Sequence, residues 1–204
     1  MGFWGERVVP ALIELAMRSE RLRPLRHTVV AAAHGRVLEL GIGSGLNLPF
    51  YGREVREVVG VDPSERLLFR ARRRAAWMPF DVRLIRQSAE HLPLAEASID
   101  CAVSSWCLCS IPEPLLALGE VRRVLKPGGA FLFVEHGLSP EPRVARWQRR
   151  LTPLWCRLAG GCRLDRPMDR LVREAGFTLE RLETGHPVPG PRLLTYHYVG
   201  VARR

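Results

Sequence analysis

Three glycines stand within five residues directly after an apolar stretch, and this feature constrains the fold more than any other. The stretch reads VLELGIGSGLN (37–47), and its glycines are Gly41, Gly43 and Gly45. Glycine adopts positive φ at no steric cost and lets another group approach the backbone closely. A glycine loop directly after a strand is typical of cofactor sites in α/β proteins. We therefore expect this loop to hold a cofactor at the carboxyl end of a strand.

The rest of the chain alternates strand-like and helix-like segments. Apolar runs predict strands at 36–41, 55–62, 81–86, 98–106, 130–136, 177–183 and 193–202. Apolar residues at helical spacing predict helices at 1–34, after Ser64, from Pro112 to the KPGG turn (126–129), at 140–164 and at 166–175. Alternation followed by two adjacent strands predicts a parallel sheet with helices on both faces, which is a three-layer α/β fold.

Length and composition predict one domain. The chain has 204 residues and is 47% hydrophobic, which is enough for one core and too little for two full domains. We expect a single domain over 1–204, with 1–34 as a helical N-terminal cap and 140–164 as a helical insertion on the substrate side. No segment approaches ~18 uninterrupted apolar residues, and the N-terminus lacks the order of a signal peptide. These features predict a cytoplasmic protein.

The cysteines and the net charge exclude several classes of partner. The five cysteines are odd in number and form no CxxC pair, so we expect free thiols and no metal site. The net charge of +10 comes mainly from arginine, with local groups at 70–74 and 143–150. Solvated arginines explain this charge, and peripheral contact with an anionic membrane is the alternative. Because no basic tract is interleaved with aromatic residues, we expect no nucleic-acid partner.

Two classes of cofactor compete for the glycine loop. A dinucleotide loop reads GxGxxG, and its third glycine lets the following helix pack closely while the helix N-terminus takes the pyrophosphate. Here Gly45 comes one residue early, and Leu46 fills the position that this motif needs. S-adenosylmethionine has no phosphate, and GxGxG gives its amino-acid tail and sulfonium access to the backbone. Asp62, at the end of the second strand, suits a ribose in either cofactor.

Further segments follow the loop in a recognisable order. They read VLELGIGSGLNLPFY, VVGVDPS, SAEHLPL, SIDCAVSSWCLCSI and EVRRVLKPGGAFLFVEH over 36–136. In this order and spacing the chain resembles the class I S-adenosylmethionine-dependent methyltransferases. The resemblance implies a three-layer Rossmann-like fold whose mostly parallel seven-stranded sheet has an antiparallel last strand. It also implies S-adenosylmethionine as methyl donor, S-adenosylhomocysteine as product, and no metal.

The later segments narrow the resemblance. SSWCLCSI, FVEH and RWQRRLTPLWCRLAGGCRLDRP are similar to a small-molecule branch that includes the animal microsomal thiol S-methyltransferases. This similarity implies a small-molecule acceptor, with a thiol favoured. Quinone-biosynthesis and phospholipid methyltransferases share the central motifs, so a quinone or phosphatidylethanolamine at the membrane surface is the alternative acceptor. A non-catalytic cofactor-binding or RNA-binding protein is the alternative from another class.

The resemblance assigns cofactor contacts along the carboxyl ends of the first four strands. Glu39 is expected beside the cationic amino group or sulfonium, and Asp62 at the ribose. The family often has an acidic residue where Ser88 stands, and Ser88 with the Ala89 backbone N–H is expected at the adenine. The full expected set is Glu39, Gly41, Gly43, Gly45, Asn47, Asp62, Pro63, Ser88, Ala89 and Ser104.

The residues expected on the acceptor side are two polar residues at the end of the fifth strand and three aromatic residues from other segments. Glu135 and His136 are the expected catalytic residues, because a histidine with a pKa near neutrality can orient a substrate or take its proton. A hydrogen bond from His136 to the backbone of 140–164 is the alternative. An apolar substrate pocket is expected among aromatic residues for which a core position is the alternative, namely Trp106, Trp147 and Tyr196.

Overall fold

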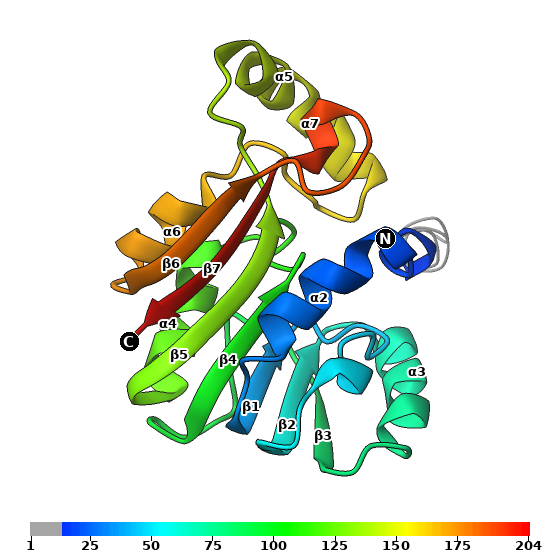
Figure 1. The fold of residues 1–204 in the computed structure, drawn as a ribbon, viewed down its shortest axis with the longest axis vertical. Coiled ribbons are helices and arrows are strands. Elements are labelled where there is room, and N and C mark those ends of the chain that lie inside the picture. The colour runs from blue at the N-terminus through cyan, green and yellow to red at the C-terminus, as the bar shows by residue number, and fades with distance from the viewer. Residues whose placement is uncertain (1–13) are drawn as a thin grey trace.

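A seven-stranded sheet runs through the centre of the molecule (Figure 1). The computed structural model describes residues 14–204. Its strands are β1 (Gly35–Leu40), β2 (Val55–Asp62), β3 (Asp81–Arg86), β4 (Ile99–Ser105), β5 (Leu125–His136), β6 (Thr178–Gly185) and β7 (His197–Arg203). Their order is β3-β2-β1-β4-β5-β7-β6, and β7 alone runs antiparallel to its neighbours. The α/β class and the reversed last strand are thereby confirmed.

Helices cover both faces of this sheet. They are α2 (Arg23–Val30), α3 (Glu65–Ala75), α4 (Pro114–Val124), α5 (Pro142–Leu158), α6 (Met168–Glu174) and α7 (Arg192–Thr195), with 3₁₀ turns η2 (Glu20–Leu22) and η3 (Leu48–Phe50). The Ser64 hydroxyl accepts a hydrogen bond from the Leu67 backbone N–H and caps α3. Pro114 occupies the first turn of α4, where its missing N–H costs no hydrogen bond.

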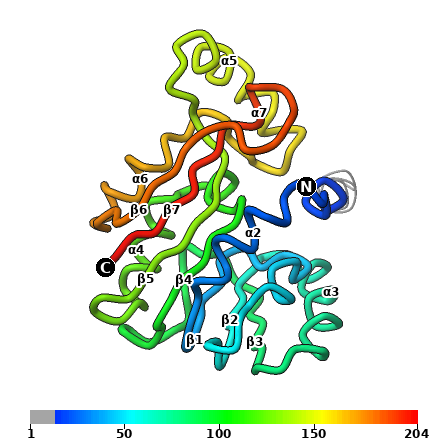
Figure 2. The backbone as a smooth tube through the Cα atoms, viewed as in Figure 1, coloured from blue at the N-terminus to red at the C-terminus, as the bar shows by residue number. Residues whose placement is uncertain are grey.

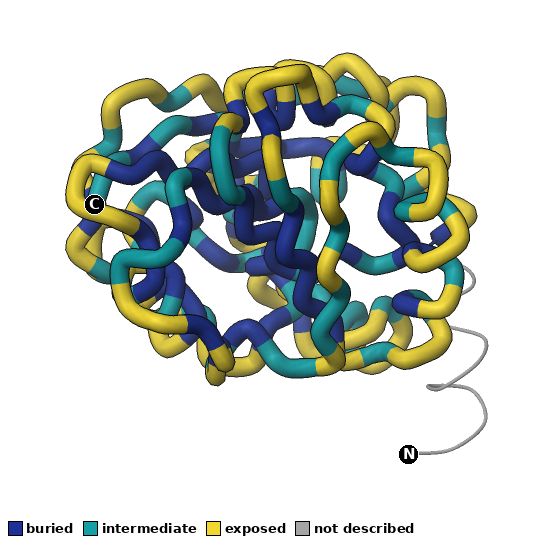
Figure 3. Tube along the Cα trace, turned by 90° about the horizontal axis from the view of Figure 1, so that it is seen from below, coloured by how far each residue is buried: buried dark blue, intermediate teal, exposed yellow. Residues whose placement is uncertain are grey.

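Two apolar layers hold the helices to the sheet, and Figure 3 shows the buried backbone at the centre of the molecule. Neighbouring residues of β1 point to opposite faces, as strand geometry requires. Leu38 packs in the layer that contains Leu118 of α4. Val37 packs in the layer that contains Val30 of α2. The chain thus buries both faces of its parallel strands, as sheets of this kind do.

The structure differs from the predicted strands at two places. Residues 193–196 were expected to open the last strand, but 193–195 belong to helix α7, Tyr196 follows that helix, and β7 begins at His197. Pro191, at φ −60°, precedes this helix and favours helical entry. The fifth strand begins at Leu125 rather than 130, because Leu125 already pairs with Ile99 before the KPGG segment bulges outward.

The predicted N-terminal cap is helical only in part. Residues 1–13 of the predicted 1–34 helix lie outside the described residues. Residues 14–17 are helical, the chain turns at 18–19, and η2 leads into α2. Over residues 14–204, the structure contains no helix that is long and apolar enough to cross a membrane.

The predicted insertion stands beyond the end of the sheet. Figure 2 shows α5 and α7 next to each other above the carboxyl end of β5. Gln148 of α5 joins them, since its side-chain amide donates to the carbonyls of Gly137 (3.0 Å) and Leu193 (3.1 Å). Its oxygen accepts from the Ser139 backbone N–H at 2.8 Å. Helix α5 is therefore fixed beyond the carboxyl ends of the strands, where the glycine loop also lies.

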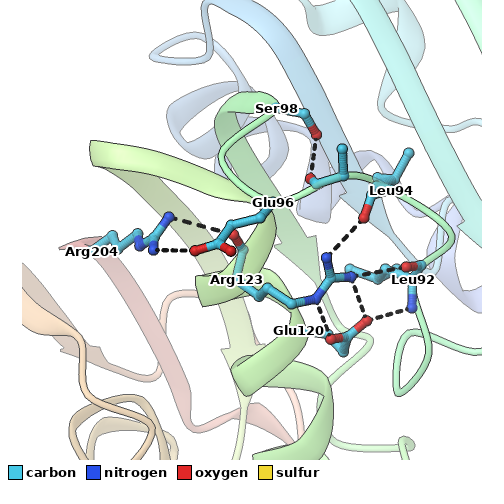
Figure 4. A network of polar contacts seen from close by, with 8 residues as sticks. Leu92, Leu94, Glu96, Ser98, Glu120, Arg123 and Arg204 are labelled. Carbon is cyan, nitrogen blue, oxygen red and sulfur yellow. Dashed lines mark hydrogen bonds and ion pairs between the residues drawn. The ribbon is translucent and has the colours of Figure 1, made fainter.

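A polar network fixes the segment between β3 and β4 (Figure 4). Arg123 of α4 donates to the carbonyls of Leu92 (3.0 Å) and Leu94 (2.8 Å) and pairs with Glu120 at 2.6 Å. Glu120 in turn accepts from the Leu92 backbone N–H at 2.8 Å. Because this segment begins at Ser88, the network holds the predicted adenine-contact region in place.

Candidate active site

The glycine loop lies where the order of the strands reverses. β1 has β2 on one side and β4 on the other, and the chain passes from Leu40 into the loop. In sheets of this kind, ligands bind in the crevice beyond the carboxyl ends of the strands at this point. Asp62 ends β2, and Ser104 pairs with Leu40 near the end of β4. The predicted donor residues therefore converge on one edge of the sheet.

The three glycines of the loop do different things. Their φ angles are 57°, 56° and 79° for Gly41, Gly43 and Gly45. A Cβ on Gly41 would collide with the Cys107 thiol, and a Cβ on Gly45 would lie 2.9 Å from Leu48. Among residues 14–204, a Cβ on Gly43 would meet only the Gly41 carbonyl oxygen, at 3.8 Å. Gly41 and Gly45 therefore serve packing, whereas the space above Gly43 is free for a ligand.

Glu39 is enclosed beneath the loop, with 2% of its surface exposed. Its two oxygens accept hydrogen bonds from the Asn47 amide (2.8 Å) and the Tyr51 hydroxyl (2.9 Å). Burial raises the pKa of Glu39 to about 7, although these hydrogen bonds and the charge of Arg26 act in the opposite direction. The carboxyl group therefore changes its charge near neutral pH.

Arg26 enters the site from helix α2 and is 5% exposed. Its guanidinium donates to the Asn47 side-chain oxygen (2.6 Å) and to the Met17 carbonyl (2.8 Å). It also lies 4.9 Å from the centre of the Trp106 ring. Burial lowers the pKa of Arg26 to about 10, so the group keeps its charge at neutral pH. The N-terminal cap thus contributes a buried positive charge beside Glu39.

Asp62 joins the loop to the start of helix α3. One of its oxygens accepts from the Gly43 backbone N–H (3.0 Å), and the other accepts from the Ser64 backbone N–H (2.8 Å). Burial raises the pKa of Asp62 in spite of these two bonds. Pro63 follows on the exposed surface. Each carboxylate oxygen keeps a free lone pair, which a hydroxyl of a ligand can use.

Ser88 lies in the segment that follows β3. Its hydroxyl donates to the Glu90 carboxylate at 2.6 Å, which directs the hydroxyl proton toward Glu90. Ala89, between them, is buried. The Ser88 hydroxyl proton is therefore engaged within the chain, and the hydroxyl oxygen remains as an acceptor.

The structure places Glu135 away from any open space, with 0% of its surface exposed. One of its oxygens accepts from the Ser104 hydroxyl (2.7 Å) and from the backbone N–H groups of Cys107 (2.9 Å) and Leu108 (3.0 Å). Burial raises the pKa of Glu135 despite these bonds. This placement differs from the predicted catalytic role of Glu135 and the predicted cofactor contact of Ser104. The two side chains bond to each other and hold the turn after β4.

Trp106 begins that turn with an unusual backbone. Its φ is 52°, a conformation that non-glycine residues rarely adopt and that often marks functional sites. Its backbone N–H donates to the Val134 carbonyl at 2.8 Å. Its ring meets the ring of His197, the first residue of β7, edge to face with 6.1 Å between the ring centres. Trp106 therefore stands at the junction of the donor and acceptor sides.

His136 meets the insertion through a thiol rather than through the backbone. Its Nε2 lies 3.1 Å from the Cys162 sulfur. Burial lowers the pKa of His136, but the contact with Cys162, a hydrogen bond to the His136 backbone and the charge of Glu135 together outweigh it, so the pKa is raised. Cys162 also accepts a hydrogen bond from the Trp155 indole at 3.4 Å. The side chain of His136 is thus at the site, but it is already engaged by the segment after α5.

The three aromatic residues predicted to line a pocket do not come together. Trp147 is 53% exposed on α5, beneath the guanidinium of Arg150. Tyr196 is buried and packs edge to face against His186 (5.3 Å) and Tyr198 (5.4 Å). Tyr196 thus takes the core position that was the alternative to a pocket, and Trp147 lies on the surface. Neither placement is the one that the sequence predicts.

Fold and site together define a class of protein: a doubly wound sheet with a reversed last strand, and a glycine loop and a buried acid at the switch point. The family model "Methyltransferase domain" matches residues 38–133. Thiol S-methyltransferase TMT1B of Homo sapiens is 33% identical over 164 residues, which cover 78% of this chain and 67% of that protein. The Rattus norvegicus TMT1B is 35% identical over 155 residues, which cover 74% of this chain and 63% of that protein.

A solved structure agrees over the whole chain. The structure described as a possible histamine N-methyltransferase from Thermotoga maritima has a TM-score of 0.70 at 25% identity and covers 99% of this chain and 100% of its own. The chain therefore belongs to the class I S-adenosylmethionine-dependent methyltransferases, in the branch of the TMT1 proteins. It spans about two thirds of the length of these curated relatives, 63% and 67%. S-adenosylmethionine is the cofactor of this family.

The residues present fit that cofactor. The free space above Gly43 is the cradle that an added Cβ would fill, and it admits a ligand against the backbone. Two buried acids flank it, and Glu39 suits a cationic group while Asp62 suits paired hydroxyls. No phosphate is required, since Leu46 stands where a dinucleotide loop needs its third glycine.

Several site residues were missed by the sequence analysis. Arg26 carries a weak signal, because it lies on the apolar stripe that Leu25 and Val29 form on α2. Tyr51 stands four residues after Asn47 and carries no signal beyond that proximity. The cluster of Cys109 and Cys162 around the end of β5 needs the fold, since 53 residues of sequence separate the two thiols.

Proposed function

We propose that this chain transfers the methyl group of S-adenosylmethionine to the sulfur of a small-molecule thiol. The observation that carries the proposal is the free space above Gly43, between the buried acids Glu39 and Asp62, at the edge where this family binds its cofactor. The names of the two TMT1B relatives support a thiol as the acceptor. Five free cysteines support a reducing, cytoplasmic setting.

On the donor side, Asp62 accepts hydrogen bonds from the ribose hydroxyls while it holds the Gly43 backbone. Glu39 supplies negative charge for the amino group and the sulfonium, with Asn47 between Glu39 and the ligand. The remaining donor contacts in the proposal are those of Pro63, Ser88 and Ala89. Ser104 contributes by fixing the turn after β4, because its hydroxyl is committed to Glu135.

On the acceptor side, the chain supplies alignment and a dry site. S-adenosylmethionine brings a methyl carbon that its sulfonium already activates toward displacement. A thiol with a pKa of ~8.5 is a few per cent ionised near neutrality, and thiolates are strong nucleophiles. The turn that begins at Trp106 and is held by Glu135 forms the wall along which the sulfur approaches. His136 orients that sulfur, and alignment of this kind supplies several kcal/mol of a transfer barrier.

The test is a transfer assay with methyl-labelled S-adenosylmethionine. The acceptors are alkyl and aryl thiols, the alcohols of the same shape, a quinol, and phosphatidylethanolamine in vesicles. We expect label in the thioether products and none in the matched alcohols. Label only in quinol or lipid contradicts the thiol acceptor. Cofactor binding without transfer to any acceptor favours a non-catalytic binding protein, and no cofactor binding overturns the whole proposal.

A second candidate acceptor rests on the outer face of α5. Trp147, Leu154 and Leu158 are 53%, 58% and 54% exposed, and their spacing of seven and four residues puts them on one helical face. Arginines flank this stripe at positions 143, 146, 149, 150 and 157. A helix with an exposed apolar face and a basic polar face suits an anionic bilayer. A quinone or lipid amine presented by a membrane is therefore the alternative acceptor.

This alternative is tested by sedimentation with vesicles of phosphatidylglycerol or of phosphatidylcholine, at low and moderate salt. It predicts binding to the anionic vesicles alone, and loss of binding in Trp147→Glu with Leu154→Glu. Leu15→Glu, at an exposed apolar site outside α5, is the matched control. Equal binding to both vesicle types, or none to either, contradicts a membrane-presented acceptor.

A further inference from the structure

Three metal-binding side chains meet on the acceptor side, and each comes from a different segment. Cys109 lies in the turn after β4, His136 ends β5, and Cys162 follows α5. Their ligand atoms all lie within 4.8 Å of one another, and the His136 Nε2 is 3.1 Å from the Cys162 sulfur. We propose that this cluster binds one zinc ion, which holds the acceptor thiol as its fourth ligand.

The ligand set and its size suit zinc. Two thiolates and one imidazole form a known catalytic zinc site that keeps a fourth position for water or substrate. With Zn–S of ~2.3 Å and Zn–N of ~2.0 Å, the ligand atoms of a tetrahedron lie about 3.5–3.8 Å apart. Small side-chain rotations bring the three atoms to that spacing. Thiolate ligands also select zinc over magnesium or calcium.

The cluster holds three protein ligands rather than four. Cys109 is buried, whereas His136 and Cys162 are each partly exposed. Within residues 14–204, no fourth cysteine, histidine or carboxylate joins the three. A structural zinc site is closed by four protein ligands, and a catalytic one has three. The geometry therefore leaves one position for a ligand from outside the chain.

Surrounding hydrogen bonds hold the three ligands in place. The Arg163 backbone N–H donates to the Cys109 carbonyl at 2.9 Å. Arg166 donates to the carbonyls of Leu108 and Pro112, and so fixes the turn that carries Cys109. The Trp155 indole donates to the Cys162 sulfur at 3.4 Å. Donors of this kind orient metal ligands and stabilise a thiolate.

The cluster shares a turn with a thiol that touches the glycine loop. Cys107, two residues before Cys109, lies so close to the loop that a Cβ on Gly41 would collide with its thiol. The turn that carries Cys109 therefore packs against the loop that we propose holds the methyl donor. The proposed role of the zinc rests on the proposed function, whereas the binding of zinc does not.

The chemistry balances as follows. The acceptor R–SH binds the zinc and loses its proton to solvent, because a coordinated thiol is deprotonated at neutral pH. Its sulfur lone pair forms a bond to the methyl carbon, and the bond from that carbon to the sulfonium sulfur breaks. The electron pair stays on the sulfur of S-adenosylhomocysteine. The products are the thioether, S-adenosylhomocysteine and one proton, and the neutral thioether leaves the zinc.

Metal content is the direct test and does not depend on activity. The full chain is purified with zinc, dialysed and analysed by elemental mass spectrometry, and is then refilled with Co²⁺. We expect one zinc per chain, and a sulfur-to-cobalt charge-transfer band with tetrahedral visible bands. Cys109→Ala, Cys162→Ala and His136→Ala should each lose the metal and the spectrum. Cys101→Ala, at a buried thiol of β4 outside the cluster, should keep both.

Thermal unfolding of each variant shows whether it still folds, and a folded variant without metal supports the site. Zinc retained at full stoichiometry by both cysteine variants overturns it. So does wild-type protein that binds neither zinc nor Co²⁺ with its thiols reduced, or that carries a Cys109–Cys162 disulfide in the presence of zinc.

The role of the zinc is tested with thiol transfer by loaded and chelator-stripped protein. At pH 7 the stripped form should be roughly 30-fold slower, since a thiol of pKa ~8.5 is then only a few per cent ionised. Its rate should rise about tenfold per pH unit, whereas the rate of the loaded form stays flat. Equal rates and pH profiles overturn the zinc role but leave the proposed function standing. Bound zinc without any thiol methylation overturns the proposed function but leaves the site standing.

Discussion

The donor side and the acceptor side of this site are built in opposite ways. The donor side comes almost entirely from one continuous stretch, residues 39–62, in which a strand, a loop and the next strand supply the groups that we propose face the cofactor. The acceptor side is assembled from the turn at 104–110, the end of β5 and the segment after α5. A family can therefore keep one donor side while it varies its acceptor by changing distant segments.

The two sides also differ in how their polar groups are satisfied. Glu39 and Asp62 each accept hydrogen bonds on both oxygens. On the acceptor side, one oxygen of Glu135 and the Nδ1 of His136 are buried without a hydrogen-bond partner among the described residues. Buried polar groups are rarely left in this state. The two acids of the donor side are thus satisfied within the described residues, whereas the Ser44 hydroxyl in the glycine loop and the two acceptor-side atoms are not.

The largest effect should come from the acid that ends β2. Asp62→Ala removes two hydrogen bonds to the loop and the contact to the ribose, each charge-assisted bond being worth about 1.5–3 kcal/mol. We expect the Kd for S-adenosylhomocysteine to rise at least about 100-fold in titration calorimetry. Asp81→Ala, at an exposed acid of β3, is the control and should bind normally. Normal binding by Asp62→Ala would break the assignment of the donor side.

The buried acid of β1 should make stability depend on pH. The pKa of Glu39 is about 7 in the folded chain against 4.5 unfolded, so the folded state binds the extra proton between these values. Its stabilising contribution is complete below pH 4.5 and is lost as the pH rises through 7, a change of about 3 kcal/mol. Urea unfolding should show a shallower pH dependence for Glu39→Gln than for wild type. Identical slopes would mean that Glu39 is not buried as described.

Substitution of Gly43 and Gly45 should separate the loop's role in cofactor binding from its role in packing. Gly43→Ala places a Cβ in free space, so it should cost about 1 kcal/mol of stability for its positive φ and weaken cofactor binding at least about tenfold. Gly45→Ala pushes a Cβ against Leu48 and should cost about 2–4 kcal/mol. Thermal unfolding and calorimetry on both variants give the comparison. A larger loss of stability for Gly43→Ala would reverse the roles of the two glycines.

The smallest effect should come from the tryptophan on the outer face of α5. Trp147 is 53% exposed, so Trp147→Ala should change stability by less than about 0.5 kcal/mol. Transfer to a soluble thiol should also be unchanged. Trp106→Ala, at the junction of the two sides, is the contrasting variant and should slow transfer. A slow Trp147→Ala enzyme would place α5 closer to the acceptor than its exposure indicates.

The strands and the loop of the donor side could be predicted from the sequence because their signals are local. A glycine loop between two apolar strands, with an acid at the end of the second, is readable from spacing alone, and the strands at 55–62 and 81–86 agree with the structure residue for residue. Where local signals mislead, tertiary contacts are the reason. The apolar letters of 193–196 suggest a strand, but Pro191 and the bond from Gln148 to the Leu193 carbonyl fix a helical turn there.

The arrangement of the acceptor side could not be predicted from the sequence, for a different reason. Glu135 lies at the end of a strand as a catalytic acid would, yet hydrogen bonds from Ser104 of β4 and from two backbone N–H groups of the following turn hold it inward. The cysteines suggested no metal because Cys109 and Cys162 lie far apart along the chain, and only the return of the segment after α5 brings them to His136. Contacts between residues so far apart in the sequence depend on how the insertion packs against the sheet. The spacing of residues along the chain does not reveal that packing.

A crystal structure of the full chain with S-adenosylhomocysteine tests the central claim most directly, namely that the cofactor lies above Gly43 between the two buried acids. We predict that the ribose hydroxyls lie within hydrogen-bond distance of Asp62, that the amino-acid tail passes over Gly43 toward Asn47 and Glu39, and that the ligand sulfur faces the turn at 104–110. A ligand bound elsewhere, or bound at the loop without contact to Asp62, would contradict the claim.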